Sequence, residues 1–141
     1  MHVLPQLRKL EKKYADVLTV VGVHSAKFNS EKSTENVREA VRRYGIGHPV
    51  VNDADFEIWK LYAVRAWPTL IFIGPSGKVI GRHEGEFDVG ALAGALDEMV
   101  AGYELTGLFK RGAFETSPEP IGEQPISYPG KITADASSNR L

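Results

Sequence analysis

The 141-residue chain contains no cysteine. This absence excludes disulfide bonds, a cysteine nucleophile and a Cys-ligated zinc ion within the chain, because each of them needs a thiolate sulfur. His24, His48 and His83 are scattered, with no partner at the spacing of metal ligands. The glycines at 45–47 and 74–77 do not match a phosphate-binding spacing. We therefore expect no metal and no cofactor.

The chain also has no long apolar run and little net charge. No stretch approaches the about 20 apolar residues that a membrane-spanning helix needs, and residues 1–14 lack the apolar core of a signal peptide. A net charge of −1 gives no electrostatic reason to bind nucleic acid or an anionic membrane. We expect a cytoplasmic globular protein that binds neither.

What the sequence does contain is an alternation of helical and strand patterns. Helical periodicity or capping signals mark four segments, residues 1–14, 34–44, 56–62 and 88–100. Apolar, largely β-branched runs mark four others, residues 18–24, 48–51, 70–73 and 78–83. The near-continuous run at 18–24 is typical of a strand buried on both faces of a parallel sheet. The order indicates the α/β class.

Several residues are placed to end or begin these elements. Ser33 or Thr34 can cap the second helix and Gly45 ends it. The Asn52–Asp55 turn can cap the short third helix, and Asp88 the last one. The turn between the last two strands ends in Pro75-Ser76-Gly77, where the glycine suits a positive φ.

The most informative segment is Trp67-Pro68-Thr69, which opens the third strand. From the residues alone, Pro68 has two interpretations. It is a cis proline that turns the chain sharply, or a trans proline at the start of a strand, where its missing N–H is tolerated. Trp67 likewise either lines a substrate groove or is an aromatic residue of the core or its rim.

The composition changes after residue 105. Residues 106–127 are rich in proline and glycine and are predicted to form a linker. Residues 128–141 begin with the pattern of another strand. The sequence therefore predicts a main domain over 1–105, a linker over 106–127, and the start of a second unit over 128–141.

Four segments, residues 1–14 with Pro5, 21–25, 56–64 and the hairpin after Trp67, resemble the thioredoxin-like domain of NHL-repeat-containing proteins. Residues 128–141 resemble the opening strand of a first NHL propeller repeat. The resemblance implies a thioredoxin-like three-layer α/β sandwich. It also implies that Pro68 is cis and that Trp67, Pro68 and Thr69 bind the backbone of a protein or peptide substrate.

The resemblance also implies what this chain lacks. In the family a proline follows the second cysteine of Cys-x-x-Cys by five positions, so Pro5 would place that cysteine immediately before Met1. We therefore expect a domain without its N-terminal strands and active-site motif. In the family, the strand before that motif lies between those equivalent to 18–24 and 70–73. These two strands must then pair directly, stay open to solvent, or accept a strand from another molecule, which includes self-association.

Three functions remain open. The first is a fragment of a thiol–disulfide oxidoreductase-type protein that is inactive as given and has no catalytic residue of its own. The second is a non-catalytic binding or assembly module next to an NHL propeller. The third, a peroxiredoxin-like protein, fits residues 52–55 and 67–70 loosely and would need a peroxidatic cysteine that is also missing.

Overall fold

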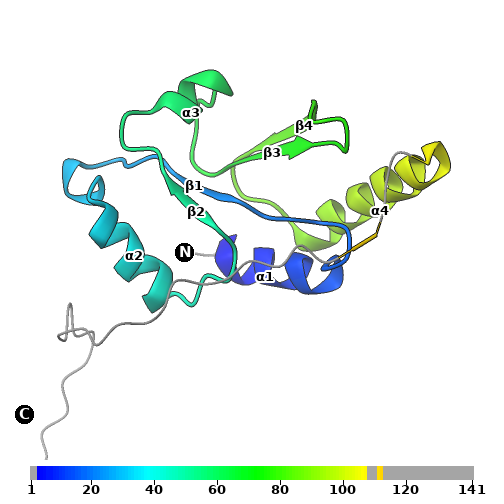
Figure 1. The fold of residues 1–141 in the computed structure, drawn as a ribbon, viewed down its shortest axis with the longest axis horizontal. Helices are drawn as coiled ribbons and strands as arrows, with labels where there is room; N and C mark the ends of the chain where they lie inside the picture. Colours follow the sequence, from blue (N-terminus) through cyan, green and yellow to red (C-terminus); the bar gives the residue numbers. More distant parts are fainter. Residues whose placement is uncertain (1–2, 108–110, 113–141) are drawn as a thin grey trace, which may run out of the picture.

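The computed structural model describes residues 3–107 and 111–112. Its elements follow the order that the sequence predicts, with helices and strands alternating until a final hairpin and helix (Figure 1). They are α1 (Val3–Lys13), β1 (Gly22–His24), the 3₁₀ turn η1 (Asn29–Glu31), α2 (Thr34–Arg43), β2 (Val50–Asn52), α3 (Glu57–Leu61), β3 (Thr69–Ile73), β4 (Val79–Glu84) and α4 (Val89–Thr106).

Helix α4 ends at Thr106, one residue past the predicted end of the main domain at residue 105, and the domain boundaries stay a prediction. Apart from residues 106–107 and 111–112, the predicted linker at 106–127 lies outside the described residues. The predicted propeller strand at 128–141 lies entirely outside them. Among the described residues, no helix combines the length and the apolar character needed to cross a bilayer.

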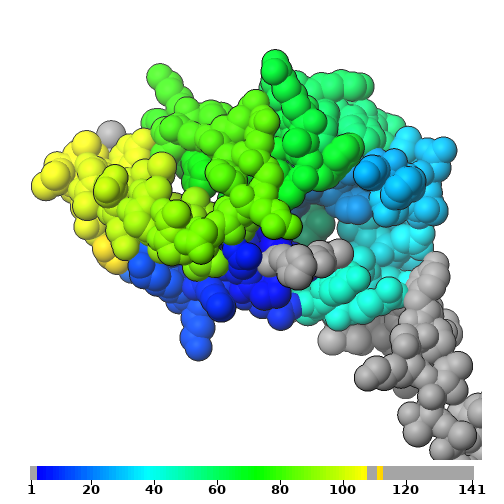
Figure 2. All heavy atoms as spheres, turned by 180° about the vertical axis from the view of Figure 1, so that it is seen from behind, coloured from blue at the N-terminus to red at the C-terminus, as the bar shows by residue number. Residues whose placement is uncertain are grey.

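The strands form two pairs. β1 runs parallel to β2, with Gly22 opposite Val50, and β3 runs antiparallel to β4, with Thr69 opposite Glu84. No ladder joins β1 to β3 in the described part of the chain, so the direct pairing that was one expectation does not occur. Helices α1 and α4 lie on one side of the strands and α3 on the other (Figure 1). From behind, the surface is hollowed between the green segment that carries the β3–β4 hairpin and the cyan segment that carries α2 (Figure 2).

β1 is shorter than the sequence predicts, because residues 18–21 do not join the ladder. The amide of Gly22 donates to the carbonyl of Pro49 at 2.8 Å. In a parallel ladder the next donor along β2 would be the amide of residue 49, and proline has none. Pro49 therefore stops the ladder at Gly22, although the apolar run continues before it.

The core lies between α1, α4 and the hairpin. Its buried members come from both helices and the loop before α4, and the inward side chains of β3 pack against them. They are Leu10, Tyr14, Phe87 and Leu96, with Leu70 and Phe72 from β3. The helical stripes that the sequence shows at both ends of the domain thus meet in one cluster.

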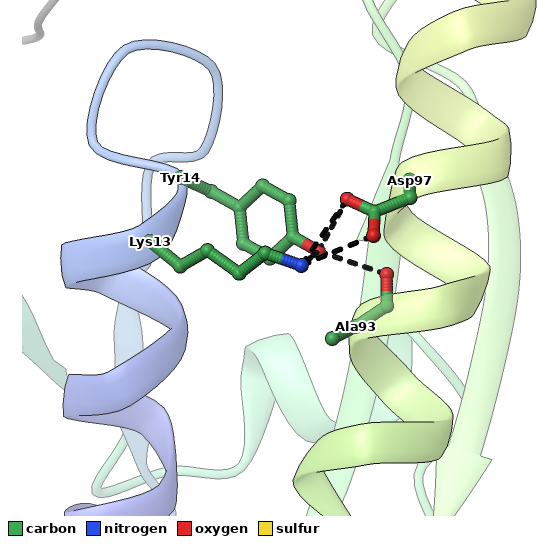
Figure 3. Close-up of polar contacts among 4 residues, drawn as sticks. All are labelled: Lys13, Tyr14, Ala93 and Asp97. Carbon is green, nitrogen blue, oxygen red and sulfur yellow. Dashed lines mark hydrogen bonds and ion pairs between the residues drawn. The ribbon is translucent and has the colours of Figure 1, made fainter.

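A polar contact locks α1 against α4 beside this core (Figure 3). The Tyr14 hydroxyl lies 2.6 Å from an Asp97 carboxylate oxygen and 2.8 Å from the Ala93 carbonyl oxygen. Lys13 Nζ donates to the Tyr14 hydroxyl at 2.8 Å and to Asp97 at 3.0 Å. The hydrogen bonds from Tyr14 and Lys13 hold the pKa of Asp97 below its ordinary value. Because the Lys13–Asp97 ion pair is exposed, solvent screens it. The hydrogen bonds of Tyr14 therefore contribute most of the stabilisation at this contact.

The predicted caps are only partly realised. The Asp88 side chain accepts from the Ala91 amide at 2.9 Å, as expected for the cap of α4. Ser33 occupies the N-cap position of α2, but its side chain makes no capping hydrogen bond. Gly45, just beyond α2, and Gly77, in the hairpin turn, adopt φ values of +56° and +76°, which glycine tolerates best.

Candidate functional site

Of the three predicted site residues, Trp67 and Pro68 lie in the loop before β3 and Thr69 is the first residue of that strand. The Trp67–Pro68 peptide bond is cis. The Thr69 hydroxyl donates to the Ala66 carbonyl at 2.7 Å and so bridges the proline. On the other side, the Gly85 amide donates to the Pro68 carbonyl at 2.8 Å. These two bonds fasten the loop both to itself and to the residue that follows β4.

Trp67 presents half of its surface to solvent, with 50% of the residue exposed. Its indole Nε1 donates to the Ser25 carbonyl at 3.0 Å. Its ring stacks on Trp59 with 4.3 Å between the centroids and 38° between the planes. A large aromatic side chain that is already held in place loses little conformational entropy when a ligand covers its free face.

Trp59 is itself supported from the side. The Phe56 ring meets it edge-on, with the centroids 5.7 Å apart and the planes at 72°. Phe56 lies at the N-cap of α3 with φ +59°, a left-handed conformation that is uncommon outside glycine. The three rings form an aromatic row that runs from the start of α3 to the exposed indole of Trp67.

A buried carboxylate joins the loops around this row. Asp53, with 5% of its surface exposed, follows β2 directly. It accepts hydrogen bonds from the Ser25 hydroxyl at 2.8 Å, the Ile58 amide at 2.9 Å and the Trp59 amide at 3.0 Å. Burial alone raises the pKa of Asp53, but these hydrogen bonds outweigh it and the pKa lies below its ordinary value. The carboxylate is therefore ionised at neutral pH.

The site stands where β1 and β2 both end. Ser25 follows β1, Asp53 follows β2, and the Trp67 loop precedes β3. Figure 1 shows α3 and the start of β3 beyond this end of the parallel pair. In α/β folds the carboxyl ends of parallel strands are the usual place for ligands, because the loops that follow the strands converge there.

The sequence predicted only some of the residues that form this site. It predicted Trp67, Pro68 and Thr69 and identified the Asp53 turn as a helix cap, which agrees with the bonds to Ile58 and Trp59. It gave no role to Ser25, which lies 28 residues from Asp53 and 42 from Trp67. No local spacing connects residues so far apart, so the sequence carried no signal for that link.

The geometry of the site is suited to contact with a ligand. No residue of the chain can supply a thiolate, and the described residues hold no group of three or more His, Asp or Glu side chains that could bind a metal ion. An apolar hollow between β4 and α4, lined by Phe72, Phe87, Leu92 and other residues, does not include Trp67, Pro68 or Thr69. The site instead offers an exposed indole beside a fixed turn of backbone.

Comparison with known proteins identifies the family. A family model described as thioredoxin-like matches residues 1–79. The chain belongs to the thioredoxin-like family. In agreement, this thioredoxin-like chain superposes on the solution structure of a thioredoxin candidate from Neisseria meningitidis with a TM-score of 0.65 and 25% identity. The superposition covers 75% of this chain and 69% of that one, and it confirms the predicted fold class.

Longer relatives show the same relationship. The thioredoxin-like chain is 42% identical over 152 residues to Protein SUPPRESSOR OF QUENCHING 1, chloroplastic, of Arabidopsis thaliana. It is 41% identical over 145 residues to NHL repeat-containing protein 2 of Bos taurus. Both alignments cover 100% of this chain, yet the chain spans only 14% and 20% of these relatives. The predicted resemblance to NHL-repeat proteins is confirmed.

The chain is also related to a thiol–disulfide oxidoreductase. It is 29% identical over 82 residues to Thiol-disulfide oxidoreductase ResA of Halalkalibacterium halodurans, an alignment that covers 58% of this chain and 44% of that protein. The relatives of the thioredoxin-like chain thus include an oxidoreductase and NHL repeat-containing proteins.

Proposed function

We propose that this chain belongs to a thiol–disulfide oxidoreductase-type protein of the thioredoxin-like family and supplies its binding surface rather than its redox chemistry. In this proposal Trp67, Pro68 and Thr69 bind an extended segment of a protein or peptide, in the cytoplasm, and the chain alone exchanges no disulfides. The observation that carries it is the half-exposed Trp67 indole, held by Ser25 and stacked on Trp59.

An extended segment suits the surface for two reasons. β3 pairs with β4 along one edge, and its other edge has no strand partner among the described residues. A peptide that runs along this edge can form main-chain hydrogen bonds, since unpaired strand groups are a template for another strand. The exposed indole beside the start of β3 can cover one of its apolar side chains.

The test measures binding of an unfolded, S-carboxymethylated model protein, whose blocked thiols exclude covalent capture. Trp67→Ala should weaken binding about tenfold, because truncating an exposed aromatic anchor removes its contact area. Leu105→Ala is the matched control, since Leu105 is 90% exposed but lies near the far end of α4. Equal affinities of wild type and Trp67→Ala would refute the binding site.

The redox half of the proposal has its own test. The purified chain should reduce a disulfide-bonded substrate no faster than the dithiol reductant alone, because the chain has no thiolate to attack the disulfide. A rate above this background that scales with the concentration of the chain would overturn the proposed inactivity.

A second candidate is a non-catalytic binding or assembly module beside an NHL propeller. The observation that favours it is the 41% identity to an NHL repeat-containing protein across the entire chain, combined with the absence of cysteine. A measurement of reductase activity in the full-length natural protein distinguishes the oxidoreductase-type protein from the assembly module. Activity supports the oxidoreductase-type proposal, whereas partner binding without activity supports the assembly module.

We further propose that two copies associate through the edge of β1 that has no strand partner in the described part of the chain. The Gly22 amide and the His24 carbonyl face β2, so the backbone groups of Val23 face away from it. Val21 and Val23 beside this edge are 54% and 45% exposed. Sedimentation should show a concentration-dependent dimer that Val23→Lys removes, because a charge on an edge strand opposes pairing. A wild-type chain that stays monomeric at high concentration would refute the proposal.

A further inference from the structure

Asp53 connects the ends of β1 and β2 to the start of α3. Its own amide donates to the His24 carbonyl at 2.9 Å, which anchors its backbone at the end of the parallel pair. Its carboxylate reaches from there to the start of α3 and to Ser25, just beyond β1. The group is buried, and the groups of the described residues that donate hydrogen bonds to it are all neutral.

Two independent routes lead from this carboxylate to the Trp67 indole. In the first, Ser25 donates its hydroxyl to Asp53 Oδ2, and its carbonyl accepts from Trp67 Nε1. In the second, the Trp59 amide donates to the same Oδ2, and the Trp59 ring carries the Trp67 ring. Asp53 Oδ2 therefore holds both residues that position the indole, Ser25 at its Nε1 edge and Trp59 at its ring face.

We infer that Asp53 is a positioning residue, which sets the orientation of the Trp67 indole beside Pro68 through Ser25 and Trp59. Its consequence for ligand binding rests on the function proposed above. Asp53 does not touch the ligand. Its effect on binding is transmitted through the two residues that hold the indole.

The chemistry requires a carboxylate at this position. Oδ2 accepts hydrogen bonds from Ser25 and Trp59, and Oδ1 accepts one from Ile58. A hydrogen bond from the Glu57 amide also lowers the pKa of this carboxyl. The site therefore offers donors and needs only acceptors. Asparagine has one acceptor oxygen, and its amide nitrogen donates. Whichever way the amide is turned, its NH₂ group meets at least one N–H or O–H donor, which leaves a buried donor without a partner.

The experiment compares Asp53→Asn and Ser25→Ala with Asp55→Asn, which changes an exposed carboxylate of the same turn. The first readout is the exciton couplet in the circular dichroism spectrum. Two indoles stacked at 4.3 Å produce such a couplet, and its amplitude depends on their mutual orientation. We expect Asp53→Asn to reduce the couplet at least about twofold, Ser25→Ala to reduce it less, and Asp55→Asn to leave it unchanged, with helical content preserved in all three.

The second readout is affinity for the S-carboxymethylated model protein, which should fall about tenfold in Asp53→Asn and remain unchanged in Asp55→Asn. An unchanged couplet in a folded Asp53→Asn variant would overturn the inference. If Asp53→Asn fails to fold, the Ser25→Ala variant provides the test, because it removes only the hydrogen bond between the Ser25 hydroxyl and Asp53. An unchanged couplet in Ser25→Ala would then overturn the inference. A reduced couplet without any ligand binding, even by the wild type, would refute the proposed function and leave the positioning role intact.

Discussion

Two regions of the molecule bury their apolar side chains very differently. The hairpin half, defined as α1, β3, β4 and α4, contains the buried cluster of Leu10, Tyr14, Phe87 and Leu96. The parallel half, defined as β1, α2 and β2, buries Val37, while Val23 of β1 and Val51 of β2 are more than 40% exposed. Because apolar burial is the main favourable term in folding, the hairpin half should hold most of the stability.

The halves meet through polar contacts and through the site itself. Arg8 of α1 donates to the Gly45 carbonyl at 3.0 Å, and Glu11 of α1 lies 2.8 Å from His48. At the site, Ser25 and Asp53 come from the ends of the parallel half, and Trp67 leads into the hairpin half. The proposed recognition at Trp67 therefore depends on a junction between a well-packed region and a poorly packed one.

The largest expected effect is on the core of the hairpin half. Leu10→Ala should lower the free energy of unfolding by about 2–5 kcal/mol, because it leaves a cavity at a residue that is 2% exposed. Urea titration followed by circular dichroism measures it. A cost no larger than that of a surface substitution would mean that stability is not concentrated in this half.

The next largest effect is expected from acid, which should lower the stability by protonating Asp53 at the junction between the two halves. The ordinary pKa of Asp53 is 3.8 and its folded pKa is lower, so its contribution to stability is complete above about 3.8 and is lost as the pH falls through the folded value. The urea midpoint of the wild type should therefore fall with pH in that acidic range. Asp53→Asn should flatten this dependence and Asp55→Asn should retain it. A parallel pH dependence in all three proteins would contradict the role of Asp53.

A smaller loss is expected at the contact between α1 and α4. Tyr14→Phe removes the hydroxyl that lies between Asp97 and Ala93 but keeps the buried ring. The free energy of unfolding should fall by about 1 kcal/mol, the typical net value of one hydrogen bond. Because the tyrosine bond is less exposed than the Lys13–Asp97 ion pair, the loss should persist at high salt, whereas a loss abolished by salt would assign the contact to the ion pair.

The smallest effect is expected in the parallel half. Val23→Thr keeps the β-branched shape and changes a side chain that is already 45% exposed in β1. The free energy of unfolding should change by less than about 0.5 kcal/mol, as for most surface substitutions. The titration is run at a chain concentration too low for the proposed β1 dimer to form, so a cost close to that of Leu10→Ala would contradict the exposure of Val23 in the single chain.

Much of the fold was predictable because its signals are local. The helical stripe that contains Leu10 and Tyr14, the cap at Asp88 and the positive φ at Gly77 are all present in the structure. The extent of β1 was overestimated, since the apolar run from residue 18 indicates a strand while Pro49 on the partner strand ends the ladder. Strand length depends on both partners, and a single segment reveals only one.

The sequence by itself determined the order of helices and strands, that no thiol chemistry can occur within these residues, and where the Trp67-Pro68-Thr69 corner falls. These properties follow from spacing and residue type within a few turns of chain. Only the tertiary structure decided that Ser25, Asp53 and Trp59 hold the Trp67 indole, and that the strands divide into two pairs. Contacts between residues tens of positions apart form only when the chain adopts its tertiary fold, and local sequence patterns do not specify them.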